Sequence, residues 1–284
     1  MHTLVFDVYG TLVDTGSIAS HLEPKLGEKA QAFAKNWRNK QLEYSYRMAL
    51  MRWYQPFHKC AEFAFDYTCE DMDVKFSEEE KKAILDKGKS LPPYPDTVEA
   101  MTLFHRSDAT LFAFSNGGSS VLEHLLHAAQ IRSFLHEVVS VESIRLYKPS
   151  RIAYAYLLER IAHFHSMPHQ TKNIKMEYAQ RHFESCIQTS SRRCLSYVES
   201  GLAEETEATM KRRDNLPDPK TVWLISSNPF DVIGAKVIGL QSVWIRRSPD
   251  VIFDPWGIEP TLTVANLLEL YDVLNYQGVV ADNS

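Results

Sequence analysis

Residues 4–11 read LVFDVYGT, a short apolar run that ends in an aspartate and then reaches a glycine. Consecutive apolar residues predict a strand that is buried on both faces. Such a strand delivers Asp7 to its carboxyl end, and Gly10 lets the backbone turn tightly around whatever the carboxylate contacts. The stretch therefore predicts an α/β fold with a functional carboxylate at one edge of a sheet.

Four further short apolar runs follow along the chain, and amphipathic helical patterns separate them. The runs are Thr110–Phe114, Val138–Ser140, Val222–Ile225 and Ser242–Ile245, and the helical patterns include Ser119–Ala129 and Ile152–Ala162. Polar residues stand at two of the strand ends, in Ser115-Asn116 and in Ser226-Ser227-Asn228. This alternation predicts a doubly wound parallel sheet, and ligands bind at the carboxyl edge of such sheets.

Residues 15–92 interrupt the strand–helix alternation with helical patterns alone. We expect helices at Ala30–Tyr54, Cys60–Cys69 and Ser77–Lys87, followed by a stiff proline-rich return at Pro92–Pro95. Because the insertion leaves just after the Asp7 loop, it predicts a cap domain (15–92) over a core formed by 1–14 and 93–284. The alternative is an extra helical subdomain without a role at the site.

A polar stretch, residues 163–220, lies between a predicted helix and the Val222–Ile225 strand. It has no strong periodicity, so we predict an insertion within the core. A zinc site from His182, Cys186 and Cys194 is an alternative, but their spacing matches no standard zinc finger.

The composition of the 284-residue chain is that of an ordinary globular protein, with 44% hydrophobic residues and a net charge of −5. This mild charge predicts no nucleic-acid or membrane partner. The four cysteines do not make a disulfide framework, and no stretch resembles a signal peptide or a membrane span. These features predict a cytoplasmic protein.

Several motifs follow Asp7 in a fixed order. Arg38 lies within the run WRNKQLEY (37–44), Lys148-Pro149 and Tyr154 come later, and SSNPFD (226–231) ends in Asp231. Together with Ser115-Asn116, their order and spacing resemble the (S)-2-haloacid dehalogenases (type II) of the haloacid dehalogenase superfamily, over residues 1–162 and 221–270. The resemblance implies a Rossmann-like core with a helical cap inserted after the first strand, and commonly a homodimer.

Tyr9 sets this chain apart from the phosphatases of that superfamily, which carry a second aspartate at the corresponding position as general acid. Ser226-Ser227-Asn228 likewise stands where the first acid of the final motif would be. Magnesium needs several oxygen ligands, and Asp7 with Asp231 alone would make a poor cage. Since a halide leaves without being protonated, we expect metal-free displacement and no cofactor.

The resemblance implies a two-step hydrolysis of a short 2-haloalkanoic acid, in which Asp7 displaces the halide from C2 with inversion and forms an ester. Water then attacks the ester carbonyl and releases an (R)-2-hydroxy acid. Lys148 would orient Asp7, and Asp231 would position or deprotonate the water. The residues to which the resemblance gives catalytic roles are Asp7, Thr11, Arg38, Ser115, Lys148, Tyr154, Ser226, Asn228 and Asp231.

The supporting roles are also read from the resemblance. Thr11 is expected to form a hydrogen bond with Asp7, and Tyr154 to give polar support to the site. Ser226 and Asn228 are expected to brace Lys148 and Asp231. Ser115 is expected to hold the substrate carboxylate, and Arg38 and Asn116 are expected to receive the halide. The substrate pocket is expected to consist of Tyr9, Arg38, Leu42, Phe57, Ser115, Asn116 and Phe230. Phe230 is a departure, because the bacterial enzymes generally have tryptophan there.

Two other functions fit the same fold. The chain could be a haloacid dehalogenase-like phosphatase, although the acids that such an enzyme uses are missing. It could also be a catalytically inactive binding protein, although Asp7, Lys148 and Asp231 are intact.

Overall fold

The computed structural model describes residues 2–167 and 216–281, and their centre is a six-stranded parallel sheet in the order β3-β2-β1-β4-β5-β6. The strands are β1 (Thr3–Phe6), β2 (Thr110–Ser115), β3 (Glu137–Ser140), β4 (Val222–Ser226), β5 (Gln241–Ile245) and β6 (Leu262–Val264). The predicted doubly wound sheet is confirmed. The sequence did not indicate β6, a three-residue strand in which only Val264 is buried.

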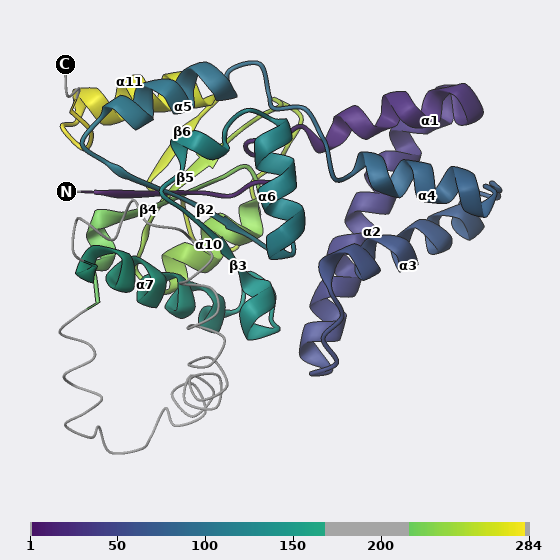
Figure 1. The fold of residues 1–284 in the computed structure, drawn as a ribbon, viewed down its shortest axis with the longest axis horizontal. Coiled ribbons are helices and arrows are strands. Elements are labelled where there is room, and N and C mark those ends of the chain that lie inside the picture. The colour runs from purple at the N-terminus through teal and green to yellow at the C-terminus, as the bar shows by residue number, and fades with distance from the viewer. Residues whose placement is uncertain (1, 168–215, 282–284) are drawn as a thin grey trace.

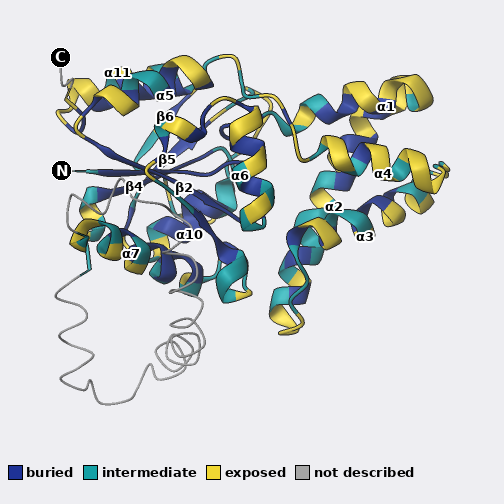
Figure 2. Ribbon diagram, in the orientation of Figure 1, coloured by how far each residue is buried: buried dark blue, intermediate teal, exposed yellow. Residues whose placement is uncertain are grey.

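Helices cover both faces of this sheet (Figure 1). One face carries α5 (Thr97–Arg106), α6 (Ser119–Ala128) and α11 (Leu267–Tyr276), and the other carries α7 (Arg151–Ser166) and α10 (Pro229–Val237). Each face of the sheet has its own hydrophobic core, and successive side chains of β1 point into alternate cores. Leu4 and Phe6 pack on the first face, and Val5 packs on the second. Figure 2 shows the strands as the most thoroughly buried part of the molecule. Short 3₁₀ helices lie at Thr15–Ile18, Gly27–Lys29, Arg132–Phe134, Val141–Ile144 and Pro219–Thr221.

Four helices stand beside this sandwich, at the right of Figure 1: α1 (Ala19–Leu26), α2 (Ala30–Leu50), α3 (Phe57–Asp71) and α4 (Glu78–Lys87). We call them the cap helices. The sequence did not indicate α1, which holds Pro24 inside it. α2 ends four residues before the predicted Tyr54, because Arg52 adopts a left-handed φ of 54°. Ser77 and Glu80 form a capping box that starts α4.

The two chain segments that join the cap helices to the sheet run side by side. The Tyr94 amide donates to the Leu12 carbonyl at 3.1 Å, and the Asp14 amide donates to the Pro92 carbonyl at 2.8 Å. Arg247 reinforces the crossing, because its guanidinium donates to Asp96 at 2.7 Å. This arrangement places the cap helices next to the carboxyl end of β1, where Asp7 lies.

α7 extends to Ser166, so residues 163–166 of the predicted insertion (163–220) belong to this helix, and the turn at Pro219–Thr221 lies at its other end. Most of it, including His182, Cys186 and Cys194, lies outside the described residues. Among the helices that are described, none has the length and apolar character needed to cross a membrane.

Candidate active site

Asp7 directly follows β1, and its carboxylate is almost completely buried. Gly10 makes the turn after it with a φ of +84°, a conformation that residues with a side chain rarely adopt. The turn brings Thr11 back toward the strand end, where its hydroxyl donates to Asp7 Oδ2 at 2.9 Å. The predicted Thr11–Asp7 bond is thus confirmed.

The Lys148 ammonium is the centre of the polar network around Asp7. Its ammonium donates to Asp7 Oδ1 at 2.9 Å, to Asp231 Oδ2 at 2.5 Å and to the Phe114 carbonyl at 3.0 Å. Burial alone would lower the pKa of Lys148, but the two carboxylates outweigh it and raise the pKa. The side chain is therefore a fully buried, charged bridge between two carboxylates.

The side chains of Ser226 and Asn228 contact Asp7, and neither has a described hydrogen bond to Lys148. The predicted support of Asp231 comes from the Asn228 backbone, whose carbonyl accepts the Asp231 amide at 3.0 Å. Asn228 Nδ2 donates to Asp7 Oδ2 at 2.7 Å, and the Ser226 hydroxyl donates to the same oxygen at 3.3 Å. The reason is strand order, because β4 is the parallel neighbour of β1 and the two strands end together. With Thr11, Oδ2 accepts three hydrogen bonds from the described residues, whereas Oδ1 accepts one. Oδ1 therefore keeps a lone pair that could attack.

Asp231 lies in the first turn of α10 and is completely buried. The Tyr154 hydroxyl donates to its Oδ1 at 2.7 Å, which agrees with the polar support expected of Tyr154. Burial raises the pKa of Asp231, and Lys148 opposes that rise. Gly234 makes the contact possible, since a Cβ atom there would lie 2.4 Å from the Tyr154 oxygen.

Ser115 and Asn116 occupy the carboxyl end of β2, beside Asp7. Asn116 Oδ1 accepts the Lys148 amide hydrogen at 2.8 Å, and Nδ2 lies 3.5 Å from the Lys148 carbonyl. In this arrangement Asn116 fixes the Lys148 backbone, a contact that the sequence did not indicate. The Ser115 oxygen accepts the Gly117 amide at 3.2 Å.

Arg38 comes to the site from α2. Its guanidinium lies 5.7 Å from the centre of the Tyr9 ring and 5.5 Å from that of Phe57, and it donates to Gln41 Oε1 at 3.0 Å. Burial lowers the pKa of Arg38 and the charge of Asp7 opposes this, but a guanidinium keeps its charge in proteins. Arg38 thus places a cation opposite the Asp7–Lys148–Asp231 cluster, which formally carries one negative charge.

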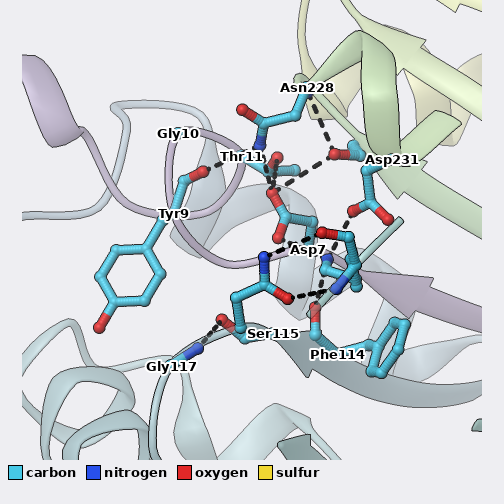
Figure 3. A network of polar contacts seen from close by, with 12 residues as sticks. Asp7, Tyr9, Gly10, Thr11, Phe114, Ser115, Gly117, Asn228 and Asp231 are labelled. Atoms are coloured by element: carbon cyan, nitrogen blue, oxygen red, sulfur yellow. Dashed lines mark hydrogen bonds and ion pairs between the residues drawn. The ribbon is translucent and has the colours of Figure 1, made fainter. Parts of the chain in front are cut away.

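A cavity of about 440 Å³ lies between the cap helices and the core. Tyr9, Arg38 and Phe57 are among the residues that line it, and Asp7 is not. The Tyr9 ring points away from the Asp7 carboxylate in Figure 3. Burial raises the pKa of Tyr9 to about 12, so its hydroxyl remains a donor at neutral pH. The other residues predicted to form the pocket are not among its lining residues: Leu42, Ser115, Asn116 and Phe230.

Sequence reasoning missed Gln41 and Tyr46. Gln41 accepts from Arg38, and the Tyr46 ring packs edge-on against Phe230 with their centres 5.5 Å apart. Arg38, Leu42 and Tyr46 follow one another at intervals of four residues on α2. This i, i+4 spacing was the available signal, because such residues share one face of a helix.

The donors around Asp7 do not suit a divalent cation. Asp7 faces an ammonium, an amide NH₂ and two hydroxyls that all donate to it, and the second carboxylate, Asp231, is held by Lys148 and Tyr154. Magnesium in proteins takes ligand oxygens that are free to coordinate it. Within residues 2–167 and 216–281, no group of three or more histidines, cysteines or carboxylates could hold a metal ion.

Comparison with known proteins agrees with this geometry. A family model for haloacid dehalogenase-like hydrolases matches residues 1–167. The (S)-2-haloacid dehalogenase H-109 of Pseudomonas putida is 26% identical over 95% of this chain and 96% of its own length. The (S)-2-haloacid dehalogenase 1 of Pseudomonas sp. (strain CBS-3) is 31% identical over 55% of this chain and 69% of its own.

Solved structures match in fold. The L-2-haloacid dehalogenase of Xanthobacter autotrophicus with chloropropionic acid covalently bound has a TM-score of 0.73 and 22% identity. The match covers 97% of this chain and 98% of that one.

Proposed function

Because the chain belongs to the haloacid dehalogenase-like hydrolase family, we propose that it hydrolyses carbon–halide bonds as an (S)-2-haloacid dehalogenase. Its substrates are short-chain (S)-2-haloalkanoic acids, and its products are (R)-2-hydroxy acids and halide. We further propose residues 15–92 as a cap domain over the core formed by 1–14 and 93–284. A homodimer and a cytoplasmic location remain predictions from the sequence.

One observation carries the proposal: Lys148 joins Asp7 and Asp231 within a single buried cluster. A nucleophilic carboxylate needs its charge balanced and its attacking oxygen aimed, and here an ammonium does both at 2.9 Å. With Tyr9 at the position of the second acid, the site lacks the group that would protonate a phosphate-ester leaving group. A departing halide has no such need.

In the first step, Asp7 Oδ1 attacks C2 of the substrate. The bond from C2 to the halogen breaks, the electron pair leaves on the halide, and a bond forms between Oδ1 and C2 with inversion. Thr11, Ser226 and Asn228 hold Oδ2, so the attacking oxygen keeps its direction throughout. Arg38 balances the charge that develops on the halide.

In the second step, water attacks the carbonyl carbon of the ester. Asp231 accepts a proton from this water, and the raised pKa that burial gives Asp231 makes it a better base than an exposed aspartate. Asp231 then gives this proton to the ester oxygen, which leaves with C2 as the hydroxyl of the product. Asp7 loses the remaining proton of the water to solvent and regains its carboxylate. Tyr154 and Lys148 hold the two oxygens of Asp231 in place for this transfer.

Halide release from each enantiomer of 2-chloropropionate, with and without EDTA, tests this proposal. We expect release from the (S) enantiomer alone, unchanged by EDTA. Single turnover in oxygen-18 water should place the label in Asp7 before it reaches the product. Phosphate-ester cleavage that requires magnesium, without halide release, would overturn the assignment in favour of a phosphatase. No activity in either assay would favour a binding protein.

A further inference from the structure

The hydroxyl of Tyr46 is a buried donor for which the described residues offer no partner. Buried hydroxyls are nearly always hydrogen-bonded, since an unpaired one costs the free energy of its lost hydration. Each buried hydroxyl without a partner therefore calls for a ligand or a water that completes it. The Tyr46 ring packs against Phe230, the chain neighbour of Asp231, so this hydroxyl lies near the catalytic cluster.

The ring contact of Tyr46 and its position on α2 place it next to residues of the site. The Tyr46 ring packs against Phe230 at 5.5 Å, and Phe230 immediately precedes Asp231 in α10. Two turns earlier on the same helix, Arg38 brings its guanidinium to the Tyr9 ring. Burial raises the pKa of Tyr46, Arg38 opposes the rise, and Asp231, Asp7 and Asp254 add to it.

The neighbouring charges identify the kind of partner. The raised pKa keeps the Tyr46 hydroxyl protonated at neutral pH, so it is available as a hydrogen-bond donor. Three carboxylates lie near Tyr46, those of Asp7, Asp231 and Asp254, and none of them is a hydrogen-bond partner of its hydroxyl. An anion that arrives with the substrate would supply the acceptor that the described residues do not.

We propose that Tyr46 donates a hydrogen bond to the departing halide, beside Arg38, and thereby sets how well the enzyme expels poor leaving groups. The inference rests on the proposed dehalogenase function. As the bond from C2 to the halogen breaks, the electron pair passes to the halide and the Asp7 oxygen bonds to C2. Tyr46 keeps its proton throughout, because it solvates the halide without protonating it.

This role makes a prediction that ring packing alone does not. Fluoride has the most concentrated charge of the halides, accepts the strongest hydrogen bonds and is the poorest leaving group. Bromide is large and weakly hydrogen-bonded. A lost donor should therefore slow the release of fluoride most, chloride less and bromide least. A lost packing contact should slow all three equally.

The test compares the wild type with Tyr46→Phe on (S)-2-fluoro-, (S)-2-chloro- and (S)-2-bromopropionate. We expect kcat to fall about tenfold to a hundredfold for the fluoro acid and less than about threefold for the bromo acid. Tyr276→Phe is the matched control, because Tyr276 is 94% exposed at the end of α11 and its variant should behave as the wild type. Equal losses on all three substrates would overturn the inference.

Halide binding tests the site independently of turnover. Chloride binding, followed by the broadening of the chloride NMR line, should weaken severalfold in Tyr46→Phe and not in Tyr276→Phe. Unchanged binding overturns the halide contact even if turnover falls. If the wild type releases no halide from any substrate, the proposed function is wrong, and the chloride titration still decides whether Tyr46 contributes to an anion site.

Discussion

On the core side of the site, every charged atom of Asp7, Lys148 and Asp231 contacts a fixed partner at hydrogen-bond distance. On the cap side, Arg38 has one side-chain hydrogen bond, to Gln41, and the Tyr46 hydroxyl has none among the described residues. A fully bonded cluster is preorganised and needs no rearrangement during the reaction. Incompletely bonded donors are ready for a ligand. We therefore propose that the core side determines the reaction and that the cap side determines the substrate.

Among the variants, Asp7→Asn on the core side should have the largest effect on turnover, a loss of about 10⁴-fold or more. Asparagine keeps the shape of the side chain but has no nucleophilic carboxylate. Lys148 retains its bond to Asp231, so the fold should survive, with a circular dichroism spectrum like that of the wild type. Asp250→Asn, on the exposed surface, is the control and should be fully active. An active Asp7→Asn enzyme would remove Asp7 as nucleophile.

Lys148→Met should lose about 10³-fold in turnover and also destabilise the protein, because two buried carboxylates lose their shared cation. Removing one partner of a buried ion pair costs about 3–5 kcal/mol in the free energy of unfolding. Urea denaturation measures this cost. Lys89→Met, which removes an exposed pair with Asp86, should cost less than about 1 kcal/mol.

The destabilisation of Lys148→Met should depend on pH with a definite sign. Without the lysine, repulsion raises a carboxyl pKa in the folded state above its value in the unfolded chain. The folded state then binds more protons, so its stability falls as pH rises through the carboxyl range and recovers at lower pH. A loss of stability that is equal at all pH values would contradict the ionic origin of the cluster.

Arg38→Lys tests whether the cap side affects activity without affecting stability. We expect kcat/KM to fall about 10²-fold, because a compact ammonium cannot replace a planar guanidinium stacked over Tyr9 and Phe57. Thermal unfolding should be nearly unchanged, in contrast to Lys148→Met. Lys40→Arg, two residues away and paired with Glu43 at the surface, should leave both measurements unaltered. A large loss of stability in Arg38→Lys would mean that the cap side is as tightly bonded as the core.

The sequence predicted the sheet well because its strands are buried on both faces and turn residues bound them. It did not indicate β6, which has one buried residue, or α1, which contains Pro24. The sequence also carried the list of residues around Asp7. It could not give their contacts, since Ser226 and Asn228 reach Asp7 only because β4 pairs with β1 in this register.

Tyr46 shows the other limit of sequence reasoning. A tyrosine on an amphipathic helix is expected to pack, and its ring does pack against Phe230. That the hydroxyl at the far end of the ring is buried without a described partner is a three-dimensional fact. The helical spacing from Arg38 could have raised the question, but the packing of α2 against the core was needed to answer it.

The smallest effect concerns pH. Burial raises the pKa of Asp231 above 3.8, the value of an ordinary aspartate, and Asp231 must be deprotonated to act as base. The rate of ester hydrolysis should therefore fall, as pH decreases, at a pH above that of an exposed aspartate. The pH–rate profile should also have an alkaline limb, where Lys148 loses its charge. The raised pKa of Lys148 keeps the ammonium charged beyond pH 10.5, so this alkaline limb lies at high pH.

Tyr154→Phe tests whether the acid limb belongs to Asp231. The Tyr154 hydroxyl donates to Asp231 and so stabilises its charged form, and its removal should raise the pKa of Asp231 further. The acid limb of kcat should then move to higher pH while the alkaline limb stays in place. A limb that does not move would assign it to a different group, and the water in the second step would need another base. Because Asp231 has no bond to any cap residue among its described contacts, Arg38→Lys should leave the same limb unmoved and change only the height of the profile.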